Sequence, residues 1–175
     1  MANPYTQIYL HVVFAVEGRQ SLIQSEHNDE LQKFITGIVT ARNQKLIVIN
    51  NMPDHLPLLV GLRPDSSLSD LVRDVKAGSS KFVNEQPWVL GRFSWQEGFG
   101  AFSYSRSQLG AVIRYIENQP KPHAKQSFRE EYVAMLKKFG VDYDPAICLQ
   151  DRRRMIFRIG RPDGAWEILG MLNYK

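Results

Sequence analysis

The chain is poor in cysteine and has no long hydrophobic run. Its 175 residues include one cysteine, Cys148, which excludes an intramolecular disulfide and a zinc site built from several thiolates. No run of about 18 apolar residues occurs, so no segment is predicted to cross a membrane. Residues 1–6 lack the basic and apolar segments of a secretory signal peptide. We therefore expect a cytoplasmic protein with no membrane partner.

A strong excess of charge of one sign is also missing. The net charge of +4 favours a polyanionic partner only weakly. Much of this excess lies at residues 151–175, where six basic side chains outnumber three acidic ones. The apolar fraction of 43% and the charged fraction of 23% are those of a globular protein. We expect one domain over residues 1–147, followed by a basic extension of unknown role over residues 148–175.

Period-two alternation predicts strands in the first two thirds of the chain. Apolar residues occupy every second position of residues 6–16, with Tyr9, His11 and Val13 on the opposite face. Shorter apolar segments predict further strands at 46–49, 55–62 and 99–104. Beyond these, a short hairpin is predicted around residues 155–159 and 166–169.

Apolar residues at helical spacing predict helices between and after these strands. Helices are predicted over about 26–42, from Ser67 or Ser69 onward, over 105–119, and from Ser127 to Gly140. The last begins with a capping box, in which Ser127 and Glu130 exchange hydrogen bonds with backbone N–H groups. The order β-α-β-β-α-β predicts an α+β fold, a ferredoxin-like split βαβ antiparallel sheet with additional C-terminal helices.

Two segments carry side chains suited to phosphodiester chemistry. Tyr115 and Gln119 are four residues apart and so share one face of their helix. His55 begins a predicted strand and points away from the apolar side chains that belong in the core. A phenol, an imidazole and an amide oxygen could together support metal-assisted attack on a phosphodiester. The simpler interpretations stay open, a tyrosine packed beside Arg114 and a hydrogen-bonded structural histidine.

Several segments, in a consistent order, resemble one family. They are Tyr9–Phe14, Met52–Val60, Val75–Ser80, Trp95–Phe102, Tyr115–Gln119 and Ser127–Tyr132. Together these motifs, which cover about residues 5–147, resemble the single-tyrosine HUH transposases of bacterial insertion sequences and their REP-associated relatives.

The resemblance implies an activity and a set of site residues. It implies a transposase that cleaves and rejoins single-stranded, hairpin-forming DNA through a 5′-phosphotyrosine, with Tyr115 as the nucleophile. It implies a divalent metal, Mg²⁺ or Mn²⁺, held by His55 and Gln119. It also implies that the protein acts as a homodimer.

One position departs from the family pattern. The second histidine of the strand pair is replaced by Pro57, which has no ligating side chain and no N–H for a strand ladder. Asp54 is expected to point away from His55, whereas His11 could replace the ligand if its strand neighbours that of His55. The alternatives are a catalytically impaired relative that binds hairpin or single-stranded DNA, and an unrelated RNA-binding or protein-interaction domain of the same fold.

Contacts with DNA are predicted from charge and hydroxyl groups. The candidates are Lys76, Ser79, Ser80, Lys81 and Arg114, whose side chains can donate to phosphates. A group of aromatic residues could stack on bases or belong to the core: Phe93, Trp95, Phe99 and Phe102.

Overall fold

The computed structural model describes residues 5–19, 21–119 and 127–143, together with the backbone of 155–160 and 166–172. The chain divides into two compact units, Met1–Asp142 and Tyr143–Lys175. The boundary predicted between residues 147 and 148 lies outside the described residues, as does Cys148. None of the helices in the described part is long and apolar enough to cross a membrane.

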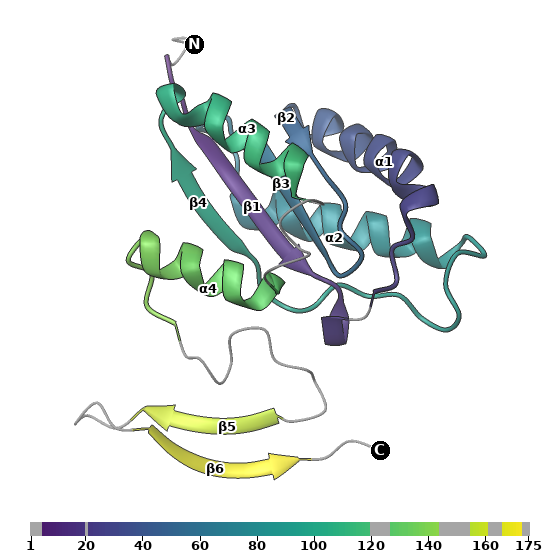
Figure 1. The fold of residues 1–175 in the computed structure, drawn as a ribbon, viewed down its shortest axis with the longest axis vertical. Coiled ribbons are helices and arrows are strands. Elements are labelled where there is room, and N and C mark those ends of the chain that lie inside the picture. The colour runs from purple at the N-terminus through teal and green to yellow at the C-terminus, as the bar shows by residue number, and fades with distance from the viewer. Residues whose placement is uncertain (1–4, 20, 120–126, 144–154, 161–165, 173–175) are drawn as a thin grey trace. The chain divides into compact units, whose positions relative to one another are not determined.

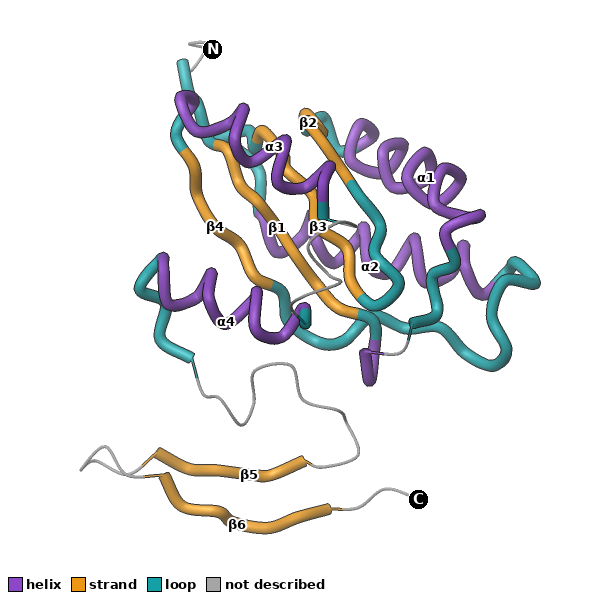
Figure 2. The backbone as a smooth tube through the Cα atoms, viewed as in Figure 1, coloured by secondary structure: helices purple, strands orange, loops and turns teal. Residues whose placement is uncertain are grey.

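Four strands of the first unit form one antiparallel sheet. They are β1 (Tyr9–Ala15), β2 (Lys45–Ile49), β3 (His55–Gly61) and β4 (Gly100–Tyr104). The strands lie in the order β2-β3-β1-β4 (Figures 1 and 2). This order confirms the predicted ferredoxin-like sheet, in which the first and third strands are central.

Helices cover both faces of this sheet. The α-helices are α1 (Asn28–Ala41), α2 (Leu68–Asn84), α3 (Leu109–Asn118) and α4 (Phe128–Lys138). The described residues also form short 3₁₀ helices, which are η1 (Glu17–Arg19), η2 (Ser25–His27) and η3 (Arg106–Gln108). Figure 1 shows α1 and α2 behind the sheet, and α3 and α4 in front of it. The two faces therefore have different cores.

The helix starts follow from their capping residues. The Ser67 side chain accepts a hydrogen bond from the backbone N–H of Asp70 and caps α2. Ser127 and Glu130 form the predicted capping box of α4. α4 is followed by Gly140, whose φ of 63° suits a residue without a Cβ just after a helix.

The main core lies between the sheet and the α1/α2 pair. It contains the apolar side chains of β1 and β3 that point to that face, including Val12, Phe14 and Leu58. Of the aromatic residues with two predicted roles, Phe93, Trp95 and Phe102 are buried. Phe99 packs against the main core. These rings therefore stabilise the fold, as the simpler interpretation held.

Pro57 lies within a regular part of the central strand. It pairs with Val13 in an unbroken β1–β3 register. Hydrogen bonds from Leu62 to Ile8 and from Val16 to Asp54 fix the alternation of the ladder and make Val13–Pro57 a non-hydrogen-bonded pair. The proline nitrogen faces the other neighbour, β2, whose pairing with β3 stops one residue short of Pro57. The sheet therefore accommodates a proline here at little cost.

The second unit contains a β-hairpin. Strand β5 (Met155–Gly160) pairs with β6 (Trp166–Leu172) in an antiparallel ladder. The hairpin predicted for this extension is confirmed, and each strand is longer than the alternation indicated.

Candidate functional site

Two histidines lie on the sheet face that α3 and α4 cover. His11 on β1 pairs with Leu59, and His55 on β3 pairs with Ala15. Because these pairs are four positions apart along the ladder, both side chains point to the same face. Both residues are buried. The strand neighbourhood expected for His11 is therefore present.

The His55 ring is held from two sides. Its Nδ1 lies 2.8 Å from a carboxylate oxygen of Asp54, and its ring stacks on Phe128 of α4 at 3.9 Å between centroids. A carboxylate only accepts hydrogen bonds, so Nδ1 is the donor in this pair. The expectation that Asp54 points away from His55 was wrong. Asp54 precedes the first residue of β3, so strand alternation does not govern its side chain.

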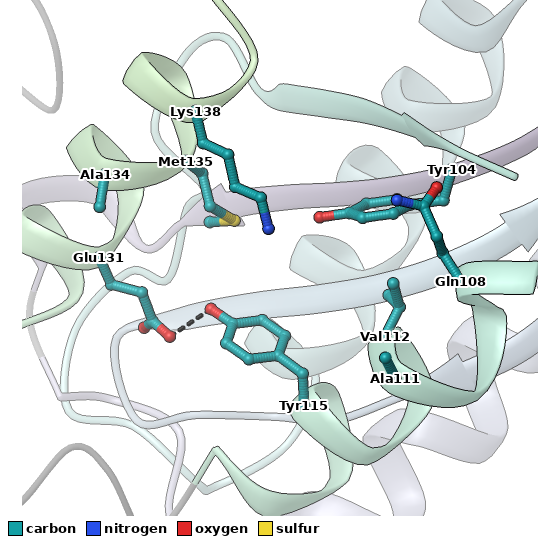
Figure 3. A pocket seen from close by; sticks show the side chains of 9 residues that line it. All are labelled: Tyr104, Gln108, Ala111, Val112, Tyr115, Glu131, Ala134, Met135 and Lys138. Atoms are coloured by element: carbon teal, nitrogen blue, oxygen red, sulfur yellow. Dashed lines mark hydrogen bonds between the residues drawn. The ribbon is translucent and has the colours of Figure 1, made fainter.

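Tyr115 lies half-buried on α3, and its ring meets the His11 ring edge to face with 6.0 Å between the ring centroids. Its hydroxyl donates a hydrogen bond to a Glu131 carboxylate oxygen from α4 (Figure 3). Burial raises the pKa of the Tyr115 phenol well above its usual value, and the Glu131 hydrogen bond and charge raise it further. A hydrogen bond with the Gln119 side chain acts in the opposite direction. The phenol is therefore protonated at neutral pH.

Gln119 lies at the C-terminal end of α3, where its backbone N–H caps the helix by donating to Ile116. The residue is 1% exposed. Its side-chain oxygen is buried without a hydrogen-bond partner among the described residues. The predicted four-residue spacing thus brings a buried amide next to the Tyr115 hydroxyl, and both face the sheet side that carries the histidines.

A pocket of about 450 Å³ lies beside the Tyr115 ring, between α3 and α4. In Figure 3 the Tyr104 and Tyr115 rings and the Lys138 ammonium point into it. Its remaining walls are Gln108, Ala111, Val112, Glu131, Ala134 and Met135. A pocket of this size can hold a small organic group. Its rings could stack on a base, and its lysine could neutralise an anion.

A comparison with known proteins identifies this arrangement. The sequence profile of the IS200-like transposases matches residues 4–119, about two thirds of the chain and including every site residue except those on α4. The chain belongs to the IS200-like transposase family. The predicted relationship to the single-tyrosine HUH transposases is thereby confirmed.

Individual family members and related structures agree with this assignment. The chain is 26% identical to the ISDra2 transposase TnpA of Deinococcus radiodurans over 120 residues, which cover 65% of this chain and 84% of that protein. A solved transposase from Deinococcus radiodurans matches with a TM-score of 0.53 at 25% identity, over 68% of this chain and 96% of that one. A REP-associated tyrosine transposase, solved with a REP hairpin, shares the fold with a TM-score of 0.54 at 15% identity, over 84% and 92% of the chains.

Two of the predicted DNA-binding side chains of this transposase are engaged inside the protein. The Lys76 ammonium donates to the carbonyl oxygens of Gln96 and Gly98, and burial lowers its pKa to about 8. Ser79 is fully buried and accepts a hydrogen bond of 2.8 Å from the indole of Trp95. A DNA contact at either residue would require these bonds to break.

The other three predicted DNA contacts lie nearer the surface. Lys81 is exposed and lies 3.9 Å from Glu85, and its helix α2 carries Ser80, which is half-buried. Arg114 is exposed on α3, next to Tyr115 in sequence. Only Arg114 shares the tyrosine's side of the sheet, because α2 covers the opposite face (Figure 1). Their contacts with DNA remain predictions.

A divalent metal requires several donor side chains that converge on one point. No group of three or more histidine, cysteine, aspartate or glutamate side chains in the described part is placed to hold one. A donor set of imidazoles with an amide oxygen is nevertheless suited to a transition ion such as Mn²⁺. The buried, unpartnered Gln119 oxygen and the Asp54–His55 hydrogen bond fit such a site, since metal-bound histidines usually donate their other N–H to a carboxylate.

Three site residues were not found from the sequence. Glu131, Phe128 and Lys138 all lie on α4, and their helical periodicity indicates only that they flank a buried stripe. The contact of Phe128 with His55 and that of Glu131 with Tyr115 depend on where α4 lies on the sheet. The one available signal was the resemblance of the Ser127–Tyr132 segment to the family, which names no role for these residues.

Proposed function

We propose that this transposase is a DNA strand transferase, with Tyr115 as the nucleophile that cleaves and rejoins single-stranded, hairpin-forming DNA. The observation that carries the proposal is the Tyr115 hydroxyl at the wall of a pocket, hydrogen-bonded to the Glu131 carboxylate. A phenol is a poor nucleophile unless a base removes its proton. Glu131 is placed to be that base.

The reaction follows from these positions. The Tyr115 oxygen attacks the phosphorus of a phosphodiester, its proton passes to Glu131, and the bond from phosphorus to the 3′ oxygen breaks. The 3′ oxygen takes a proton from solvent, and the 5′ phosphate stays linked to Tyr115. Because no free phenolate forms before attack, the raised pKa of Tyr115 does not prevent the reaction. Attack by another 3′ hydroxyl on the phosphotyrosine rejoins the DNA.

A divalent metal would bind at His55 and Gln119. When bound, it would neutralise negative charge on the phosphate under attack. The protein's own residues hold the geometry: Asp54 orients the His55 ring, and Phe128 restricts its rotation. The Gln119 side chain, in contact with the Tyr115 hydroxyl, would link the ligand set to the nucleophile.

The experiment is to trap the covalent intermediate. Purified protein is incubated with Mn²⁺ and an end-labelled library of hairpin-containing oligonucleotides, and adducts are resolved on a denaturing gel and located by peptide mass spectrometry. We expect an adduct at Tyr115 that Tyr115→Phe abolishes. Tyr104→Phe is the matched control, because it removes the other phenol of the same pocket. An adduct on a different residue, or none with any oligonucleotide, would contradict the proposal.

Pro57 supports a second candidate function, a catalytically impaired relative that binds hairpin or single-stranded DNA without cutting it. The variant Pro57→His separates the two. If the natural chain binds the hairpin library without forming an adduct, and Pro57→His gains cleavage, the chain is an impaired copy with an otherwise competent site. Equal adduct formation by both proteins would exclude impairment at this position.

The partners of the proposed function are DNA and a second copy of the chain. A related transposase has been solved with a REP hairpin, which supports hairpin DNA as the partner here. The homodimer follows from the family resemblance, and light scattering during size-exclusion chromatography tests it. A mass of one chain at all accessible concentrations, with and without DNA, would contradict the dimer.

A further inference from the structure

The pocket between α3 and α4 has two chemically different ends. At one end the Tyr115 hydroxyl donates a hydrogen bond to the Glu131 carboxylate. Lys138 lies seven residues after Glu131 on α4, which places its Cα two helical turns, or about 10 Å, further along the helix. From there its ammonium points into the pocket (Figure 3). The pocket therefore joins the proposed nucleophile to a cation.

The walls between these two ends are mostly apolar. They include Ala111, Val112, Ala134 and Met135. Within the part of the chain that the structure describes, the Lys138 ammonium forms no ion pair or hydrogen bond, so it is free to bind an anion that enters. A flat, weakly polar group that carries an anion on one side fits these surfaces. A nucleotide has both parts, a base that packs through its faces and a phosphate that binds a lysine.

The direction of attack selects the nucleotide of a DNA strand that can lie in this pocket. The attacking and leaving oxygens of a phosphoryl transfer are roughly in line across the phosphorus, so the leaving nucleotide lies opposite the Tyr115 hydroxyl. The Tyr115 ring is itself a wall of the pocket, which places the pocket on the side of the nucleophile. The nucleotide that keeps the 5′ phosphate is attached to one side of this line, from where it can turn back along the ring toward Lys138.

We propose that the pocket is a subsite for the nucleotide whose 5′ phosphate becomes linked to Tyr115, and that Lys138 binds the 3′ phosphate of that nucleotide. The base lies between the apolar walls, and the ammonium neutralises a phosphate that is not itself attacked. Lys138 thereby sets the position of the strand at Tyr115 without taking part in bond breaking. The inference rests on the proposed function for the role of Tyr115, whereas occupation of the subsite is measurable without cleavage.

The test compares two small ligands. Thymidine 3′,5′-bisphosphate carries a base and both phosphates, and thymidine 5′-monophosphate lacks the 3′ phosphate. Binding to the full chain is followed by nuclear magnetic resonance titration in EDTA, so that no metal takes part. We expect the bisphosphate to bind about tenfold more tightly, because Lys138 adds a charge-assisted contact. Glu131 repels the 5′ phosphate of both ligands, so the difference between them reports the 3′ phosphate.

The variant Lys138→Gln should lower the affinity for the bisphosphate to that for the monophosphate. Lys137→Gln is the matched control, because it removes the same charge from the neighbouring exposed residue in the last turn of α4, outside the pocket lining. Glutamine is about as good a helix former as lysine, so both variants should fold. Equal affinity of the two variants for the bisphosphate, or no preference of the natural chain for the bisphosphate, would overturn the proposal.

A second measurement shows whether the occupant is DNA. Fluorescence anisotropy with the hairpin-containing oligonucleotides should show weaker binding by Lys138→Gln than by Lys137→Gln. In the adduct assay, Lys138→Gln should raise the DNA concentration for half-maximal adduct formation and leave the rate at saturating DNA unchanged, because the phosphate that Lys138 binds is not attacked. Weaker bisphosphate binding together with the same DNA affinity as Lys137→Gln would mean that the pocket takes a free nucleotide, which overturns the proposal.

The outcomes distinguish this inference from the proposed function. A Tyr115 adduct that both lysine variants form equally at every DNA concentration keeps the proposed function and overturns the subsite. Bisphosphate and DNA binding that depend on Lys138, in a chain that forms no adduct, support the subsite and contradict strand transfer.

Discussion

At the scale of single residues, burial sets the protonation states of the site's side chains more than residue type does. His11, His55 and Gln119 are all nearly or fully buried, although polar side chains of these types are often exposed. Burial keeps His11 neutral and Tyr115 protonated. The same phenol and imidazole on an exposed surface would titrate near their usual pKa values.

Burial of His11 predicts a pH dependence of stability in metal-free protein. The folded pKa of about 4 lies below the ordinary 6.5, so between these values the unfolded chain binds more protons. The free energy of unfolding should therefore fall as the pH decreases from 6.5 to 4, by about 3 kcal/mol at most. Urea unfolding in the presence of EDTA at pH 7, 5 and 4 measures this change.

The control for the pH prediction is His11→Phe. The other ionisable groups facing the ring, Tyr104, Tyr115 and His55, stay present in both proteins and contribute equally. The variant should lose less stability than the natural chain over this range. Parallel profiles for the two proteins would show that His11 is not held neutral by the fold.

The Glu131 carboxylate predicts a rate effect on adduct formation. Glu131→Gln keeps an oxygen that can accept from Tyr115 but is a far weaker base, so single-turnover adduct formation should slow about 100-fold or more. Glu130→Gln is the matched control, because it changes the adjacent residue while glutamine can retain the capping box. Equal rates for the two variants would show that Glu131 does not act as the base.

At the scale of elements, α4 completes the site. It contacts His55 through Phe128 and Tyr115 through Glu131. The helix lies close to the sheet at Gly100 of β4, where an added Cβ would come within 2.6 Å of the Tyr132 ring. Glycine is needed here because α4 approaches the strand closely. Its backbone conformation is not the reason, because Gly100 does not have a positive φ.

The variant Gly100→Ala should displace Tyr132 and with it α4. We expect a loss of about 1–3 kcal/mol in the free energy of unfolding, as for other overpacked sites, together with slower adduct formation because Glu131 moves from Tyr115. Chemical denaturation and the gel assay measure the two effects. The control is Gly37→Ala on α1, where an added Cβ meets nothing within 4 Å, and which should stabilise by up to about 1 kcal/mol. A neutral Gly100→Ala would mean that α4 is not packed against β4.

At the scale of the whole molecule, the site belongs to one of two units. The sheet, the four α-helices and the core that joins them lie within Met1–Asp142. The hairpin of β5 and β6 lies in Tyr143–Lys175, where six basic side chains outnumber four acidic ones. A single truncation can therefore separate the residues of the site from the basic extension.

Truncation after Asp142 should leave the first unit folded, because that unit contains its own core. We expect an unchanged unfolding transition by circular dichroism and a retained Tyr115 adduct. Because net positive charge is lost, affinity for a nonspecific single strand should fall and depend less on salt. Fluorescence anisotropy at two salt concentrations measures this. A truncated chain that does not fold would show that the extension is part of the structural core.

Alternation, helical spacing and capping residues predicted the strands and the α-helices, because these are local signals, and the order of the motifs indicated the family. The 3₁₀ helices η1 and η2 were not predicted. Ser67 and Ser127 begin their helices as their side chains predict. The sequence also indicated Tyr115 and Gln119 as a pair, since four residues along a helix are neighbours in any fold.

Which elements meet depends on how they pack in three dimensions. Sheet order made β1 the neighbour of β3, which placed His11 and His55 on the same face of the sheet. The docking of α4 brought Glu131 to Tyr115 and Phe128 to His55. Spacing along the chain does not encode such contacts, because they depend on the packing of surfaces far apart in sequence. The same packing excludes water from the site and so sets the pKa values on which its chemistry depends.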